Sequence, residues 1–109
     1  MIALILGTSE GREILSLLNK FTDNILISTA TAYGGEILKN YKYKKLNTKP
    51  LNKEELSNML KENQVNILID ASHPYALEVT KNAREVSKDL NIEYLRYESC
   101  LLYTSDAAD

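Results

Sequence analysis

Two glycines stand between an apolar run and a helix-like pattern in the segment LILGTSEGREI, which spans Leu4 to Ile14. Glycine lets backbone approach a bound group closely, and the following helix would point unpaired N–H groups and its positive dipole end the same way. Together with the hydroxyls of Thr8 and Ser9, Gly7 and Gly11 therefore predict a seat for phosphate or pyrophosphate. The spacing is not the full G-x-G-x-x-G fingerprint of dinucleotide sites, and the Lys-Ser/Thr pair of a P-loop is missing. A tight turn with close helix-to-sheet packing, and Ser9 as N-cap, remains the alternative.

A second polar segment, ISTAT, ends the next apolar run about twenty residues further on. At this distance an NAD-binding domain usually presents Asp or Glu to the ribose 2′-hydroxyl, and no carboxylate stands here. Ser28, Thr29 and Thr31 can hydrogen-bond a 2′-phosphate without repelling it, and Arg12 can add positive charge. We therefore predict NADPH as the cofactor, with NADH as the other option. The alternative is that the hydroxyls only cap the end of a strand.

The third segment, DASHPY at 70–75, contains the one histidine of the chain. The simplest interpretation is a helix start, with Pro74 in the first turn and Ser72 or His73 as N-cap. A histidine beside a cofactor can also donate a proton or bind a substrate carboxylate, so His73 is the candidate catalytic residue. With one histidine and one cysteine we predict no metal site, and Cys100 is interpreted as a small buried apolar residue.

Apolar runs and helical patterns take turns along the chain. Runs at 2–6, 25–29 and 67–70 are apolar at successive positions, as expected of parallel strands buried on both faces. The alternating segment 92–97 predicts a more exposed strand. The lysine-rich segment 41–47 predicts an edge strand, because lysines suit an exposed sheet edge.

Helical spacing recurs three times between these strands. Asn52 with Glu55 resembles a capping box, which predicts a helix that ends near Asn63. The apolar residues of the other two predicted helices are Ile14, Leu15, Leu17, Leu18 and Phe21 in the first, and Val79, Ala83, Val86 and Leu90 in a helix that begins at Tyr75.

This order of elements predicts a Rossmann-like, doubly wound α/β fold with a parallel sheet and helices on both faces. Right-handed crossovers give the strand order 3-2-1-4-5. The first and fourth strands then lie side by side at the switch point, where such sheets bind ligands at their carboxyl ends. The segments GTSEGR and DASHPY are therefore expected to meet at one site.

Composition limits the other options. The chain has 109 residues with thirteen basic and fifteen acidic side chains, so its net charge is −2. One domain is expected, and nucleic acid is a poor candidate partner. The longest unbroken apolar run, 2–6, is too short to span a bilayer, and no basic segment precedes it. We expect a cytoplasmic protein without a membrane partner.

Four segments in order carry a resemblance to a known family: ILGTSEGRE, TATAYGGEIL, DASHPYA and NAREVSKDLNIEYLRYE. They resemble the N-terminal half of precorrin-6A reductase, including its cobalt-precorrin-6A counterpart in cobalamin biosynthesis. The resemblance implies that a reduced nicotinamide dinucleotide, usually NADPH, delivers hydride to a double bond of a macrocycle that carries many carboxylates. It also implies a second α/β domain after this one, with the macrocycle in the cleft between the two.

The resemblance implies a role for each matching segment. The turn from Gly7 to Arg12 would hold the cofactor, and the segment that begins with Ser28 and Thr29 would lie beside the adenosine ribose. The implied substrate or nicotinamide contacts are Tyr33, Gly34, Gly35, Ser72, His73 and Tyr75. The family often has a second glycine where this chain has Leu6, which is expected to crowd the turn slightly. The loop glycines can instead serve only to shape a loop, and the two tyrosines only to cover apolar surface.

The resemblance ends at Glu98. We expect residues 1–98 to form an NAD(P)-binding domain and residues 99–109 to be a frayed tail, with the second domain of the family absent from this chain. The preferred function is the cofactor-binding half of a reductase, for which catalysis needs the missing domain. A non-catalytic nucleotide-sensing domain remains the alternative. An extended epimerase or dehydrogenase is disfavoured, because the one Tyr-x-x-x-Lys pair, Tyr41 with Lys45, falls on the predicted exposed edge.

Overall fold

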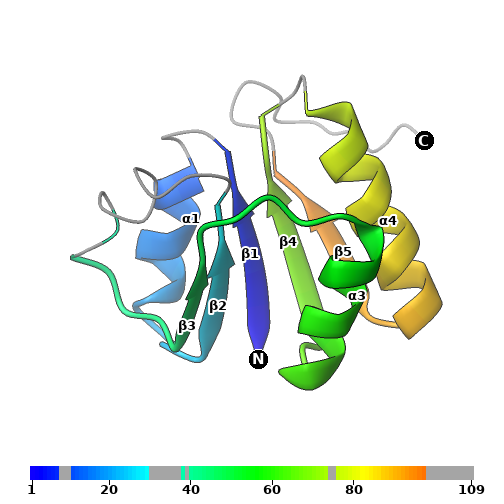
Figure 1. Cartoon of the computed structure of the whole chain (residues 1–109). Helices are drawn as coiled ribbons and strands as arrows, with labels where there is room; N and C mark the ends of the chain where they lie inside the picture. The colour runs from blue at the N-terminus through cyan, green and yellow to red at the C-terminus, as the bar shows by residue number, and fades with distance from the viewer. Residues whose placement is uncertain (8–10, 30–37, 39, 74–75, 98–109) are drawn as a thin grey trace.

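Five parallel strands form one sheet in the computed structural model, which describes residues 1–7, 11–29, 38, 40–73 and 76–97 (Figure 1). The strand order is β3-β2-β1-β4-β5, so the predicted Rossmann-like arrangement is confirmed. The strands are β1 (Ile2–Leu6), β2 (Ile25–Ser28), β3 (Lys45–Asn47), β4 (Ile67–Ala71) and β5 (Glu93–Arg96). β1 pairs with both β2 and β4, so it lies at the centre of the sheet, as the sequence predicted.

Helices cover both faces of the sheet (Figure 1). On one face α1 (Gly11–Leu18) buries Leu15 against Leu4 and Leu6 of β1. On the other face α3 (Lys53–Glu62) and α4 (Leu77–Leu90) pack against Ala3 and Ile5 of the same strand. Successive β1 side chains thus enter opposite clusters, because neighbouring residues of a strand point to opposite faces. This double burial explains why the central strands are apolar at every position.

Capping and exposure agree with the sequence in two places. Asn52 is the N-cap of α3, where its Oδ1 accepts the Glu55 N–H at 2.7 Å and Glu55 Oε1 accepts the Asn52 N–H at 3.0 Å. The predicted capping box is therefore confirmed. β5 alternates between exposed and half-buried residues, and β3 is an edge strand that keeps only three residues of the predicted segment 41–47.

The predicted start of α4 is wrong. The helix begins at Leu77 with Ala76 as its N-cap, and no side chain caps it. Ser72 and His73 are therefore not helix caps. Pro74, predicted in the first turn of this helix, lies outside the described residues. The Ala76 N–H bonds to the carbonyl of His73 at 2.9 Å, which links the N-cap residue of α4 to the residues that follow β4.

The predicted apolar stripe of the first helix is also partly wrong. α1 ends at Leu18, and the side chain of Phe21 beyond it is 82% exposed. Leu17 lies within the helix but is 54% exposed. Within the described ranges, no helix is long and apolar enough to cross a membrane.

Candidate functional site

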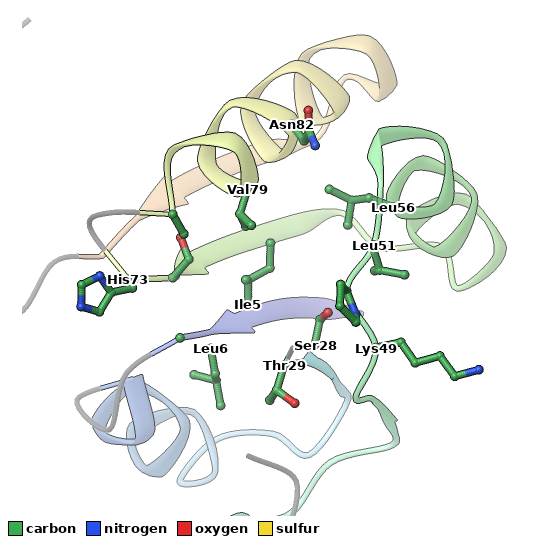
Figure 2. A pocket seen from close by; sticks show the side chains of 14 residues that line it. Ile5, Leu6, Ser28, Thr29, Lys49, Leu51, Leu56, His73, Val79 and Asn82 are labelled. Atoms are coloured by element: carbon green, nitrogen blue, oxygen red, sulfur yellow. The ribbon is translucent and has the colours of Figure 1, made fainter. Parts of the chain in front are cut away.

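A pocket of about 250 Å³ lies at the carboxyl ends of β1, β2 and β4, on the side of the sheet that α3 and α4 cover (Figure 2). Apolar side chains from the sheet, from both helices and from the segment before α3 form much of its wall: Ile5, Leu51, Leu56 and Val79. Polar residues complete the lining at the strand ends and on α4: Ser28, Thr29, Lys49, Ser72, His73 and Asn82. Among the described residues that line this pocket, none is an aspartate or a glutamate.

Gly7 is explained by close backbone packing. A methyl group at this position would lie 2.5 Å from the backbone nitrogen of His73 and 2.9 Å from the Cα of Ser72. The Gly7 N–H also bonds to the Ala71 carbonyl at 3.1 Å, which draws the ends of β1 and β4 together. The packing alternative is therefore sufficient for Gly7, whether or not a ligand also approaches this backbone. Gly11 begins α1, as the strand–turn–helix pattern predicted.

The hydroxyl of Ser28 is held by an amide from the neighbouring strand. Asn47 Nδ2 donates to Ser28 Oγ at 3.1 Å and to the Lys49 carbonyl at 2.7 Å. Because Ser28 Oγ accepts this bond, its own hydrogen is left to donate to another group. The Thr29 N–H bonds to the Asn47 carbonyl at 2.8 Å, so the predicted pair of hydroxyl residues sits against the end of β3.

Ser72 is fixed from three sides. Its N–H donates to Asp70 Oδ1 at 3.0 Å, and its Oγ accepts from Arg96 Nη1 at 3.0 Å. The same oxygen lies 3.3 Å from Thr80 Oγ1 on α4. The turn that carries Ser72 and His73 is thus tied to β4, β5 and α4 at once.

Asp70 is the centre of this network and is fully buried. Its carboxylate accepts from Tyr94 Oη at 2.8 Å and pairs with Arg96 Nη1 at 3.1 Å. Burial raises the pKa of the Tyr94 hydroxyl, and the nearby Asp70 charge raises it further. Tyr94 therefore remains a hydrogen-bond donor well above neutral pH.

His73 lies at the edge of the pocket with an exposed imidazole. His73 is a lining residue of the pocket, but in Figure 2 its ring points away from the other labelled side chains. The ring therefore faces outward from the apolar interior of the pocket. This position suits contact with a group outside the pocket better than contact with one buried inside it.

The structure brings together Gly7, Ser28, Thr29, Ser72 and His73 of the predicted site. Arg12 lies on α1 and is not part of the pocket wall. The other predicted site residues, together with Cys100, lie outside the described residues: Thr8, Ser9, Thr31, Tyr33, Gly34, Gly35 and Tyr75.

Sequence reasoning missed the residues that hold the site. Asn47 and Lys49 could have been predicted from their place at and just after the carboxyl end of β3. The carboxyl ends of parallel strands border the ligand crevice in sheets of this kind. Asp70 stood in a quoted motif without a role, and its partners on β5 require the strand register that pairs Asp70 with Arg96.

The described residues fit a dinucleotide in their donor set and charge. Hydroxyl and amide donors border an apolar cavity, and no lining carboxylate would repel phosphate. Among the residues that the structure describes, no group of three or more His, Cys, Asp or Glu side chains could hold a metal ion.

Fold and pocket together define a doubly wound α/β protein with a crevice at the switch point of its sheet. A family model described as Precorrin-6x reductase CbiJ/CobK matches residues 1–105. The chain belongs to this family.

Curated relatives agree with the family match. The chain is 41% identical over 98 residues to the cobalt-precorrin-6A reductase of Methanocaldococcus jannaschii, a match that covers 89% of this chain and 39% of that protein. It is 34% identical over 94 residues to the enzyme of the same name from Methanococcus maripaludis, with 84% and 38% coverage. The chain therefore spans about two-fifths of the length of these relatives.

A solved structure has the same fold. The structure of CobK precorrin-6A reductase aligns with a TM-score of 0.74 at 20% identity and covers 99% of this chain and 41% of that one. At this identity the likeness supports the fold alone.

Proposed function

We propose that this chain is the cofactor-binding part of a reductase that acts on precorrin-6A or cobalt-precorrin-6A in cobalamin biosynthesis. Membership of the Precorrin-6x reductase family supports the reaction class. The named relatives are cobalt-precorrin-6A reductases, and they are longer than this chain. Reduction of the macrocycle is accordingly assigned to this part together with a second α/β domain, and we place the enzyme in the cytoplasm.

NADPH is the proposed cofactor, and the pocket at the strand ends is its proposed site. When bound, a reduced nicotinamide dinucleotide supplies the hydride for a double bond of the macrocycle. The observation that carries this proposal is the pocket wall, which combines hydroxyl donors at the end of β2 with an absence of carboxylates among its described residues. An Asp or Glu there would favour the free 2′-hydroxyl of NADH and repel a 2′-phosphate.

The proposed roles follow the position of each residue. The pyrophosphate would be received by Gly7, Thr8 and Ser9 and by the start of α1 at Gly11 and Arg12, because a helix N-terminus favours an anion. Ser28 and Thr29 would bind the adenosine ribose and its phosphate. Substrate contacts would come from Tyr33, Gly34, Gly35, Ser72, His73 and Tyr75.

A calorimetric titration of the chain with NADPH and NADH tests the cofactor. We expect NADPH to bind at least as tightly as NADH, and Ser28→Asp to reverse that order by repelling the 2′-phosphate. A clear preference of the wild type for NADH would contradict the assignment. Dinucleotide binding without any effect of a corrinoid precursor, in the protein completed by its second domain, would favour a nucleotide-sensing domain instead.

His73 is tested in the protein completed by its second domain. Because α4 has no side-chain cap, His73→Asn removes no helix cap, and we expect a folded protein. NADPH affinity should change by less than about tenfold, whereas reduction should slow by about ten- to a hundredfold, or roughly 1.4 to 2.7 kcal/mol. Turnover equal to the wild type would remove His73 from the catalytic assignment.

A further inference from the structure

We propose that Arg96 is a positioning residue for the pocket, acting through Asp70 and Ser72 to hold the backbone at Ser72 and His73, which directly follows β4. This backbone is called the turn below. The inference rests on the proposed function for the identity of the ligand, because the position of this turn is expected to affect dinucleotide binding. Arg96 itself is not part of the pocket wall.

The contacts of Arg96 converge on one short segment. Its Nη1 lies 3.1 Å from Asp70 Oδ1, 3.2 Å from the Asp70 carbonyl and 3.0 Å from Ser72 Oγ. Only the Ser72 end of this set reaches the pocket, where Ser72 is a lining residue. One guanidinium nitrogen thus connects the end of β5 to the backbone that precedes His73.

The position of this pair is more informative than its energy. A buried ion pair is weak evidence for stability, because apolar side chains of similar volume often stabilise a fold equally well. Here the pair stands beside the pocket, since the β1–β4 register places Asp70 next to Ile5, a residue of the pocket wall. Arg96 forms directional contacts with Asp70 and Ser72, which an apolar side chain at the same position would not provide.

The turn is packed closely against the end of β1. Its backbone at Ser72 and His73 is in van der Waals reach of Gly7, where even a methyl group would not fit. A shift of this turn therefore changes the spacing between the two strand ends that border the pocket. A displacement of about 1 Å is enough to weaken a precise binding site.

The experiment compares Arg96→Met, which removes the guanidinium, with Arg96→Lys, which keeps a charged donor. The control is Lys53→Met, which removes the exposed ion pairs of Lys53 with Glu85 and Asp89. Lys53 is not a lining residue of the pocket. Two readouts are taken on the 109-residue chain: NADPH affinity by calorimetry, and the proton NMR signals of His73. The latter are unambiguous, because the chain has one histidine.

We expect Arg96→Met to shift the His73 signals in the absence of ligand and to weaken NADPH binding about tenfold. Arg96→Lys should recover affinity to within about threefold of the wild type, and Lys53→Met should change neither readout. Unchanged His73 signals in a folded Arg96→Met variant would overturn the proposal.

A double variant separates position from charge. Asp70→Asn with Arg96→Met removes both charges and leaves the turn without its guanidinium contact. The proposal predicts that binding stays weak, whereas recovery to the wild-type value would leave only an effect of charge and overturn it.

Two further outcomes are covered by the design. If Arg96→Met does not fold, Ser72→Ala takes its place, because it removes only the hydroxyl that Arg96 holds. Unchanged His73 signals and unchanged affinity in Ser72→Ala would then overturn the proposal. If the wild type binds no dinucleotide, the proposed function fails, but the His73 signals still decide whether Arg96 positions the turn.

Discussion

Two ion pairs of nearly equal length differ in how far they are exposed to water. Lys53 Nζ lies 3.0 Å from Glu85 Oε1 between α3 and α4, and Arg96 Nη1 lies 3.1 Å from Asp70 Oδ1 between β5 and β4. The side chains of the first pair are 48% and 43% exposed, whereas those of the second are 20% and 0% exposed. Water screens the first pair and is excluded from much of the second, so burial and not distance determines what each contributes.

The largest effect is expected when the buried pair is broken. Arg96→Met leaves the Asp70 carboxylate buried without its cationic partner, which should reduce the free energy of unfolding by about 3–5 kcal/mol. Urea unfolding followed by circular dichroism measures this change. A loss below 1 kcal/mol would place the pair in the same class as the exposed one.

The packing around the ends of β1 and β4 can also be disturbed without changing a charge. Gly7→Ala puts a methyl group 2.5 Å from the backbone nitrogen of His73, a contact that only a shift of one strand end can relieve. We expect a loss of about 1–3 kcal/mol in the free energy of unfolding, by the same urea measurement. An unchanged midpoint would mean that the two strand ends separate without cost.

Tyr94→Phe removes one neutral donor from the buried carboxylate and keeps the ion pair. Leaving Asp70 Oδ2 without this bond should cost about 1–2 kcal/mol at neutral pH. Because the pKa of Tyr94 is raised in the folded state, its contribution is complete below the unfolded pKa of about 10 and is lost as the pH rises further.

The matching measurement is the free energy of unfolding between neutral and strongly alkaline pH. The wild type should lose stability more steeply above about pH 10 than Tyr94→Phe does. Parallel curves for the two proteins would contradict the raised pKa.

The smallest effect is expected at the exposed pair. The hydrogen bond and charge of Lys53 lower the pKa of Glu85, so any contribution is present at neutral pH and lost as the pH falls through that lowered value. The hydrogen bond and charge of Glu85 in turn raise the pKa of Lys53. On the alkaline side the contribution of the pair is therefore lost as the pH rises through that raised value. Lys53→Met should therefore melt within experimental error of the wild type at physiological salt, and a clear drop in its melting temperature would contradict the contrast with Asp70–Arg96.

The sequence predicted the fold where the signals were local. Unbroken apolar runs such as 2–6 identified strands covered on both faces, and Asn52 with Glu55 identified the start of α3. Chain order and right-handed crossovers then determined the order of the strands. Helix ends were less predictable, because Phe21 continues the helical spacing after α1 has ended.

The site was predictable only in part. Strand ends on a parallel sheet must meet at one edge, so the proximity of Gly7, Ser28 and His73 follows from topology. The contact of Arg96 with Ser72 depends on the register of two strands and on the choice of a side-chain rotamer, which a residue pattern does not contain. The N-cap prediction at Ser72 or His73 failed because α4 begins only at Leu77, with Ala76 as its N-cap.

The central place of β1 has a consequence for synthesis on the ribosome. β1 leaves the exit tunnel before the other described strands and can pair with β2 soon afterwards, but its other edge pairs with β4, which emerges much later. Until then an apolar strand edge is open to neighbouring nascent chains, the kind of surface that chaperones cover. Slowing translation between β2 and β4 should therefore increase aggregation, even though the finished sheet leaves β1 with no free edge.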